Sequence, residues 1–155
     1  MSSTLETDEW PEGRLGMHYL ADLTGCPVDK IATVEAIEST FVEILEEHGA
    51  TVLGVRTHQF EPAGATIVVL LAESHASVHT WPENNTACID IFTCGPGLDA
   101  DAAMLALADA LLADRTHLRV IERRAGDEWN GQIRATFSGS CSGTGPDTCC
   151  VQHHL

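Results

Sequence analysis

Lysine and aromatic residues are scarce in this sequence. The 155 residues include a single lysine, Lys30, and aromatic side chains make up 5% of the chain. Enzymes that form an imine through a protein amine need a lysine in the active site. Lys30 lies at the start of a predicted surface helix, which is an unsuitable position for such a group. If this protein uses imine chemistry, we expect the electrophile to come from another source.

Positive charge is also in short supply. Eight Lys and Arg residues stand against 23 Asp and Glu residues, which gives a formal net charge of −15. Nucleic acid is bound through basic surfaces, so this charge argues against a nucleic-acid partner. It mildly favours cationic ligands through long-range attraction. An acidic surface that serves only solubility would give the same net charge, so the charge alone does not identify a ligand.

Membrane spans and metal-binding motifs are missing as well. No segment approaches the roughly 20 apolar residues of a membrane helix. Residues 1–13 are acidic and polar, unlike a secretory signal, so we expect a soluble cytoplasmic protein without a membrane partner. The six cysteines form no C-x-x-C pair, which predicts neither a disulfide framework nor a zinc site. His75 and His79 would lie roughly 13 Å apart on a strand, so we expect no shared metal ion.

The sequence does have the alternating pattern of one α/β domain. Apolar residues recur at helical spacing over 31–48, with Asp29 as the expected N-cap and Gly49 as the end of the helix. A second helix is predicted from Asp99 to about Ala113. Short runs bounded by turn residues predict six strands, at 16–23, 51–60, 66–72, 75–81, 86–93 and 116–123.

Strands joined by short turns favour an antiparallel sheet. We therefore predict a two-layer α/β sandwich, with a mostly antiparallel sheet and two helices on one face. The continuous apolar run at 66–72 is typical of a buried central strand. The domain is expected at 14–126, between a disordered N-terminus at 1–13 and a flexible C-terminal tail at 127–155, which is small and polar.

Reactive polar residues crowd into the segment 73–94. The pattern is E-S-H-x-S-x-H-T-W-P-E from Glu73 to Glu83, followed by D-x-F-T-C-G, which ends at Gly95. This pattern resembles prokaryotic S-adenosylmethionine decarboxylase, and the sequences G-M-H-Y-L-A-D-L-T-G-C at 16–26 and F-E-P-x-G at 60–64 are similar to it too. The resemblance implies a pyruvoyl-dependent carboxy-lyase.

The resemblance implies a proenzyme that cleaves itself. The Ser74 hydroxyl would attack the carbonyl of Glu73, and elimination from the resulting ester would leave a covalent pyruvoyl group made from Ser74. His79 would be the processing base, and Thr66 stands where the family usually has a serine that assists this step. The pyruvoyl ketone would form a Schiff base with the substrate amine and act as an electron sink, as pyridoxal phosphate does elsewhere. Cys94 would then donate a proton to the product.

The resemblance also implies a homodimer. Along a straight strand, Thr66 and Ser74 would lie roughly 26 Å apart, and the family brings such residues together at a two-fold interface. Ser74 and Cys94 of one chain would face four residues of the partner chain: Thr66, His79, Phe60 and Glu83. Of these, Phe60 would stack on the adenine and Glu83 would bind the ribose hydroxyls.

Three functions stay open at this stage. S-adenosylmethionine, which yields the aminopropyl donor for spermidine synthesis, is the first expected substrate. The segment 84–86 differs from the family beside the proposed ribose contact, so a pyruvoyl-dependent arginine or ornithine decarboxylase is the alternative. An uncleaved, non-catalytic binding homologue is the third.

Taken singly, several of these residues have plainer explanations. Glu83 could be a solvated turn residue, and Phe60 could be a core aromatic. His75 is expected to be structural, and Cys88 to pack within a strand. The tail residues His153 and His154 are expected to be a solvated pair, and Cys149 with Cys150 has no explanation.

Overall fold

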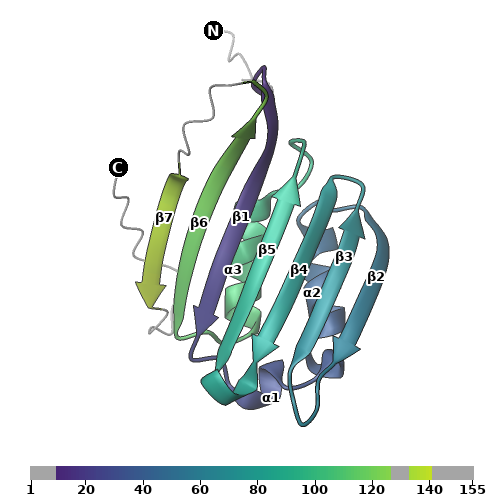
Figure 1. The fold of residues 1–155 in the computed structure, drawn as a ribbon, viewed down its shortest axis with the longest axis vertical. Coiled ribbons are helices and arrows are strands. Elements are labelled where there is room, and N and C mark those ends of the chain that lie inside the picture. Colours follow the sequence, from purple (N-terminus) through teal and green to yellow (C-terminus); the bar gives the residue numbers. More distant parts are fainter. Residues whose placement is uncertain (1–9, 127–132, 141–155) are drawn as a thin grey trace, which may run out of the picture.

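The computed structural model describes residues 10–126 and 133–140. In this part of the chain, seven strands form one antiparallel sheet in the order β2-β3-β4-β5-β1-β6-β7. Helices α2 and α3 lie together on one face of the sheet (Figure 1). The predicted two-layer sandwich is therefore confirmed.

The elements are β1 (Arg14–Thr24), α1 (Val28–Ile31), α2 (Val34–Glu47), β2 (Val52–Gln59), β3 (Ala65–Leu71), β4 (Ser74–Trp81), the short 3₁₀ helix η1 (Pro82–Asn84), β5 (Thr86–Thr93), α3 (Ala100–Ala110), β6 (Arg115–Arg124) and β7 (Ile133–Ser140).

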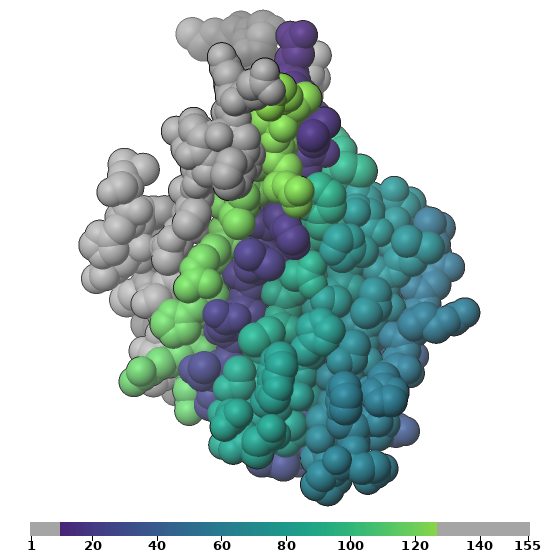
Figure 2. Space-filling model, viewed as in Figure 1, coloured from purple at the N-terminus to yellow at the C-terminus, as the bar shows by residue number. Residues whose placement is uncertain are grey.

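The sheet has one buried face and one open face. In β5, Ile89 and Ile91 are buried, whereas Asp90 between them and Phe92 after them are only half-buried. This alternation follows from the two-residue period of a strand, which sends successive side chains to opposite faces. Figure 2 shows the open face, over which no helix of the described chain lies. None of the described helices is long and apolar enough to cross a membrane.

Strand β3 corrects one prediction. Its apolar run was expected to be a buried central strand, but only alternate residues such as Ile67 and Val69 are buried. Val68 and Leu70 lie on the open face and are 42% and 57% exposed. A run of apolar residues does not reveal that only one face of a sheet is covered. The open face therefore carries unusually exposed aliphatic side chains.

Helix α2 begins later than predicted. Thr33, not Asp29, is its N-cap, and the Thr33 side chain accepts a hydrogen bond of 3.2 Å from the backbone N–H of Ala36. Asp29 lies within α1, a separate single turn, because the extended backbone of Thr33 interrupts the helical path. Gly49 ends the helix with φ of +99°, as expected of a glycine at this position.

Both ends of the predicted domain also differ from the prediction. Thr116–Arg123 was expected to be the last strand, but Ile133–Ser140 forms β7 within the expected tail and pairs along β6. The free edge of β6 offers unpaired backbone groups that a further strand satisfies. At the N-terminus, Trp10 packs against the core and donates a 3.0 Å hydrogen bond to the carbonyl of Arg14. The rest of both expected flexible segments lies outside the described residues.

Candidate active site

Ser74 begins β4 directly after a tight turn from β3. It pairs with Leu71 across the hairpin and with Thr93 of β5 on its other side. Its φ is 152°, a backbone conformation that residues other than glycine seldom adopt. Such a conformation costs on the order of 1–3 kcal/mol and persists only where the surrounding structure imposes it. The strain therefore lies at the peptide bond between Glu73 and Ser74.

The carbonyl oxygen of Glu73 is held by one residue, Cys94. The Cys94 backbone N–H donates a hydrogen bond of 3.0 Å to this oxygen, and the Cys94 thiol donates another of 2.8 Å. The Glu73 carboxylate in turn accepts the backbone N–H of Thr51, at 3.0 and 3.3 Å to its two oxygens. Two donors on one carbonyl polarise it and are placed to stabilise negative charge on its oxygen.

Next to Ser74, a hydrogen-bonded cluster forms on the open face from three neighbouring strands. His75 Nδ1 lies 3.3 Å from Ser74 Oγ. His75 Nε2 and His18 Nε2 each lie 3.1 Å from the same oxygen, Oδ2 of Asp90. The Ser77 hydroxyl donates to the other oxygen, Oδ1. We call His18, His75, Ser77 and Asp90 the Asp90 cluster.

The electrostatics of this cluster keep Asp90 ionised. Burial raises the pKa of Asp90, but hydrogen bonds from His18 and Ser77 and the nearby charges of His75 and His18 outweigh it, so the pKa is lowered. The two imidazole nitrogens and the carboxylate oxygen lie within 4.8 Å of one another. Their mutual hydrogen bonds already use the atoms that a metal ion would need, so we do not assign these residues as metal ligands.

A cavity of about 320 Å³ lies at the opposite end of β3 and β4. His79 pairs with Thr66, and its Nδ1 lies 2.9 Å from the Thr66 hydroxyl. His79 Nε2 lies 3.4 Å from Ser77 Oγ, which links this pair to the Asp90 cluster. Phe60 is 47% exposed, so it is not a core aromatic. The cavity is lined by Phe60, Ala63, Ala65, Thr66, His79, Thr80, Trp81 and Glu83.

The structure therefore divides the predicted site residues into two groups. Glu73, Ser74 and Cys94 lie together at one end of β4, and the other four predicted residues line the cavity at the other end: Phe60, Thr66, His79 and Glu83. Ser74 and His79 are five residues apart on this strand, which is roughly 16 Å. Within one chain, His79 does not reach Ser74.

All four members of the Asp90 cluster were missed or undervalued in the sequence. His75 was expected to be structural, and His18, Ser77 and Asp90 were assigned no role. Strand alternation could have placed His75, Ser77 and Asp90 on one face, because all three occupy that face in neighbouring strands. What the sequence does not give is the register that sets His75 opposite Phe92 and Ser77 opposite Asp90.

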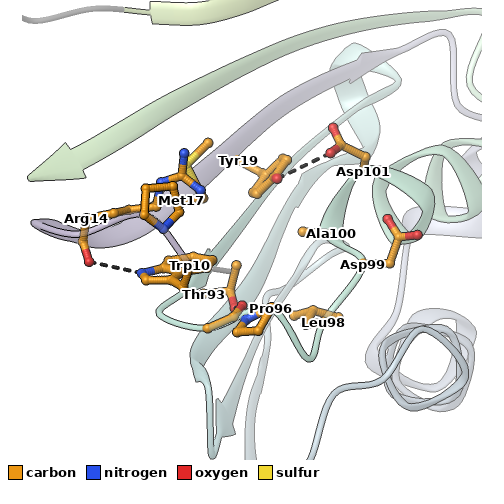
Figure 3. A pocket seen from close by; sticks show the side chains of 12 residues that line it. Trp10, Arg14, Met17, Tyr19, Thr93, Pro96, Leu98, Asp99, Ala100 and Asp101 are labelled. Carbon is orange, nitrogen blue, oxygen red and sulfur yellow. Dashed lines mark hydrogen bonds between the residues drawn. The ribbon is translucent and has the colours of Figure 1, made fainter. Parts of the chain in front are cut away.

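Another cavity, of about 560 Å³, lies on the helix side of the sheet (Figure 3). Trp10, Tyr19 and Asp101 border it, and the Tyr19 hydroxyl donates a 3.3 Å hydrogen bond to Asp101. Burial and the Asp101 carboxylate raise the pKa of Tyr19 to about 12. None of the predicted site residues lines this cavity, but Thr93 and Gly95, on either side of Cys94, border it.

Comparison with known proteins gives one consistent result. The sequence model of a family described as S-adenosylmethionine decarboxylase matches residues 17–124. A protein named S-adenosylmethionine decarboxylase proenzyme from Aquifex aeolicus is 42% identical over 121 residues, which cover 78% of this chain and 90% of that protein. Another of the same name, from Persephonella marina, is 43% identical over 112 residues, with coverages of 72% and 84%. The crystal structure of the adenosylmethionine decarboxylase from Aquifex aeolicus has a TM-score of 0.68 and 41% identity, and the match covers 77% of this chain and 98% of that chain.

Proposed function

Because the chain belongs to the S-adenosylmethionine decarboxylase family, we propose that it is a carboxy-lyase that acts on S-adenosylmethionine. It is made as a proenzyme and cleaves itself between Glu73 and Ser74 to generate a covalent pyruvoyl group. The observation that carries this proposal is the Glu73–Ser74 junction, where an unusual φ at Ser74 adjoins a carbonyl that accepts two hydrogen bonds from Cys94. The arginine and ornithine alternative has no comparable support, since the relatives named above are S-adenosylmethionine decarboxylases.

The junction suits an acyl shift from nitrogen to oxygen. Attack of the Ser74 hydroxyl turns the Glu73 carbonyl oxygen into an oxyanion, and the Cys94 N–H and thiol are already directed at this oxygen. Relief of the unusual φ at Ser74 favours departure from the amide. Elimination from the ester then releases Glu73 as a new chain end.

The mature site needs a ketone, which none of the twenty amino-acid side chains provides. Once formed, the pyruvoyl ketone would supply an electrophile for the substrate amine and accept the electrons of the broken carbon–carbon bond. Cys94 remains beside this group and is exposed, so its thiol is placed to return a proton to the product. The single lysine, Lys30, lies in α1 and takes no part.

We propose that the complete site forms between two copies of the chain. The cavity with Phe60 and Glu83 lies too far from Ser74 of the same chain, and a two-fold dimer would bring it to Ser74 of the partner. The open face of the sheet supports this arrangement, because Val68, Leu70 and Trp81 are exposed there at 42%, 57% and 42%. Such apolar exposure is typical of an interaction surface.

The first test is the intact mass of the purified protein under denaturing conditions. We expect two chains, one ending at Glu73 and one that begins at position 74 and is one ammonia lighter than a chain with an N-terminal serine. Release of labelled carbon dioxide from S-adenosylmethionine, compared with ornithine and arginine, then identifies the substrate. The matched variant Ser74→Ala should stay in one piece and be inactive.

Two outcomes would reject the proposal. A single uncut wild-type chain would show that no pyruvoyl group forms. A cut chain that releases carbon dioxide only from ornithine or arginine would keep the self-cleavage and overturn the substrate.

A further inference from the structure

Self-cleavage begins with removal of the Ser74 hydroxyl proton, so a base must lie beside this hydroxyl. His79, which the family resemblance makes the base of the later elimination, is bonded to Thr66 at the far end of β4 in the same chain and would reach Ser74 only from a partner chain. We propose that His75 is the base that takes the Ser74 hydroxyl proton in the first step, and that Asp90 positions it. This inference rests on the proposed function and adds a catalytic residue to its first step.

The contact between Ser74 and His75 is not what an ordinary strand provides. Side chains of consecutive strand residues point to opposite faces of the sheet. The φ of 152° at Ser74 departs from strand geometry, and Ser74 Oγ comes within 3.3 Å of His75 Nδ1. The same backbone distortion thus strains the scissile junction and brings its nucleophile to an imidazole.

Asp90 determines which nitrogen of His75 is free to act. An ionised carboxylate only accepts hydrogen bonds, so His75 Nε2, at 3.1 Å from Asp90 Oδ2, must carry the hydrogen. In the neutral imidazole the other nitrogen, Nδ1, is then an unprotonated acceptor. This is the nitrogen that faces the Ser74 hydroxyl. Ser74, His75 and Asp90 are therefore ordered as nucleophile, base and orienting carboxylate.

Further contacts hold this carboxylate and imidazole in place. His18 Nε2 donates to the same Asp90 oxygen at 3.1 Å, and Ser77 donates to the other oxygen. The Phe92 ring packs against both imidazoles, at 5.3 Å from His18 and 5.9 Å from His75. Positions fixed in this way lower the cost of reaching the reacting geometry.

The step conserves atoms and charge. His75 Nδ1 takes the proton of the Ser74 hydroxyl while Ser74 Oγ forms a bond to the carbonyl carbon of Glu73. The carbon–nitrogen bond of the junction then breaks, and the imidazolium returns the proton to the departing nitrogen. An amide becomes an ester and a free amine, with no external reactant.

The groups around His75 also set the expected pH dependence. Asp90 on β5 and His18 on β1 bond or contact its ring, and Arg123 on β6 stacks on Phe92 from 5.5 Å. A protonated imidazole cannot accept the Ser74 proton, so cleavage should slow in acid.

The test follows the cleavage of freshly made full-length chain. Wild type and His75→Gln are produced by cell-free synthesis, and the uncut fraction is followed on denaturing gels from about pH 5 to 9. We expect His75→Gln to cleave at least ~100-fold more slowly, at the lower end of what general bases contribute. Its remaining rate should lose the acidic limb of the pH profile. Added imidazole should partly restore cleavage in His75→Ala.

Hydroxylamine separates the two steps of processing, because it cleaves esters faster than amides. If His79 acts in the elimination, His79→Gln should accumulate an ester that hydroxylamine cuts. His75→Gln and Asp90→Asn should accumulate none. The matched control is His117→Gln, an exposed histidine on β6 that belongs to neither group of site residues, and it should cleave within a few-fold of wild type. Circular dichroism checks that each variant is folded.

Each result has a defined meaning. Wild-type cleavage together with normal cleavage in His75→Gln overturns the role of His75 and leaves the proposed function standing. An ester that accumulates in His75→Gln also overturns it, because the first step would then proceed without this base. Equal losses in His117→Gln and His75→Gln would show that the loss is not specific to His75 and would overturn its role as the base. A wild-type chain that never cuts overturns the proposed function itself.

Discussion

Tyr19 is the one tyrosine of the sequence, and the residue is only 8% exposed. Its hydroxyl donates to Asp101 in the cavity on the helix side of the sheet (Figure 3). Burial, and then the charge of Asp101, raise the pKa of Tyr19 from 10.0 to about 12. Burial and the charge of Asp99 also raise the pKa of Asp101. The pair is therefore most stable with a neutral phenol.

The ionisation of Tyr19 can be followed directly by the ultraviolet absorbance of tyrosinate. We expect no tyrosinate until the pH approaches 12. Because the folded-state pKa is raised, Tyr19 stabilises the fold fully below about pH 10, and this contribution is lost as the pH rises toward 12. Asp101→Asn should lower the pKa of Tyr19, whereas Asp22→Asn on the open face should not. Ionisation near pH 10 in protein that circular dichroism shows to be folded would contradict the assignment.

Individual site residues could be predicted where the motif contains them, but the contacts between them could not be predicted. Glu73, Ser74 and Cys94 were predicted to share a site; the structure places Cys94 in hydrogen-bond contact with Glu73, next to Ser74, and the roles of the three stay predictions. Asp90 was not predicted, because its importance depends on the register between β4 and β5 and on His18 from β1. Such register results from the packing of whole strands, which one sequence pattern does not specify.

At the scale of elements, the start of α2 gives a test. Thr33→Ala removes the side-chain acceptor for the Ala36 N–H and should lower the free energy of unfolding by about 1 kcal/mol. The measurement is urea unfolding in a Ser74→Ala background, which keeps the chain in one piece. Asp29→Ala is the control and should change stability by less than about 0.5 kcal/mol. A larger loss of stability in Asp29→Ala than in Thr33→Ala would instead support Asp29, the N-cap expected from the sequence.

Element types were predictable because the two hydrophobic periods differ clearly. The helical period in α2 and α3, and the short alternating runs of β1, β4 and β5, specified their conformation correctly. Strand β7 was missed, since its polar surroundings suggested a tail and its partner is the edge of β6. The one-sided burial of β3 was missed because apolar side chains also cover the open face.

At the scale of the whole molecule, two features would be explained by a second copy of the chain: the exposed open face and the two separated groups of site residues. Each chain holds a complete cleavage junction and a complete cavity, yet it does not hold them together. A symmetric pair would solve both problems by covering exposed aliphatic side chains and joining each junction to a cavity. The following test restores activity only if each site combines residues of two chains.

Mixed dimers should recover activity from two inactive variants. Ser74→Ala lacks the pyruvoyl precursor, and Phe60→Ala carries a damaged cavity. When the two are co-expressed, each mixed dimer has one site with an intact Ser74 from one chain and an intact Phe60 from the other. We expect decarboxylation well above that of either variant alone, measured on mixed dimers purified through two different tags. Activity no greater than that of Phe60→Ala would show that each site lies within one chain.

The order of the strands would have a consequence for the protein once it has cut itself at the proposed position between Glu73 and Ser74. The first fragment supplies β1, β2 and β3, and the second supplies β4, β5, β6 and β7. In the sheet, β1 lies between β5 and β6, so a strand of the first fragment is enclosed by two strands of the second. The polypeptides would be interleaved, and neither could leave without the sheet being opened along three ladders of hydrogen bonds, β3 with β4, β1 with β5 and β1 with β6. Loss of the covalent link at position 73 would therefore create a two-chain protein that behaves as one body and comes apart only when it unfolds.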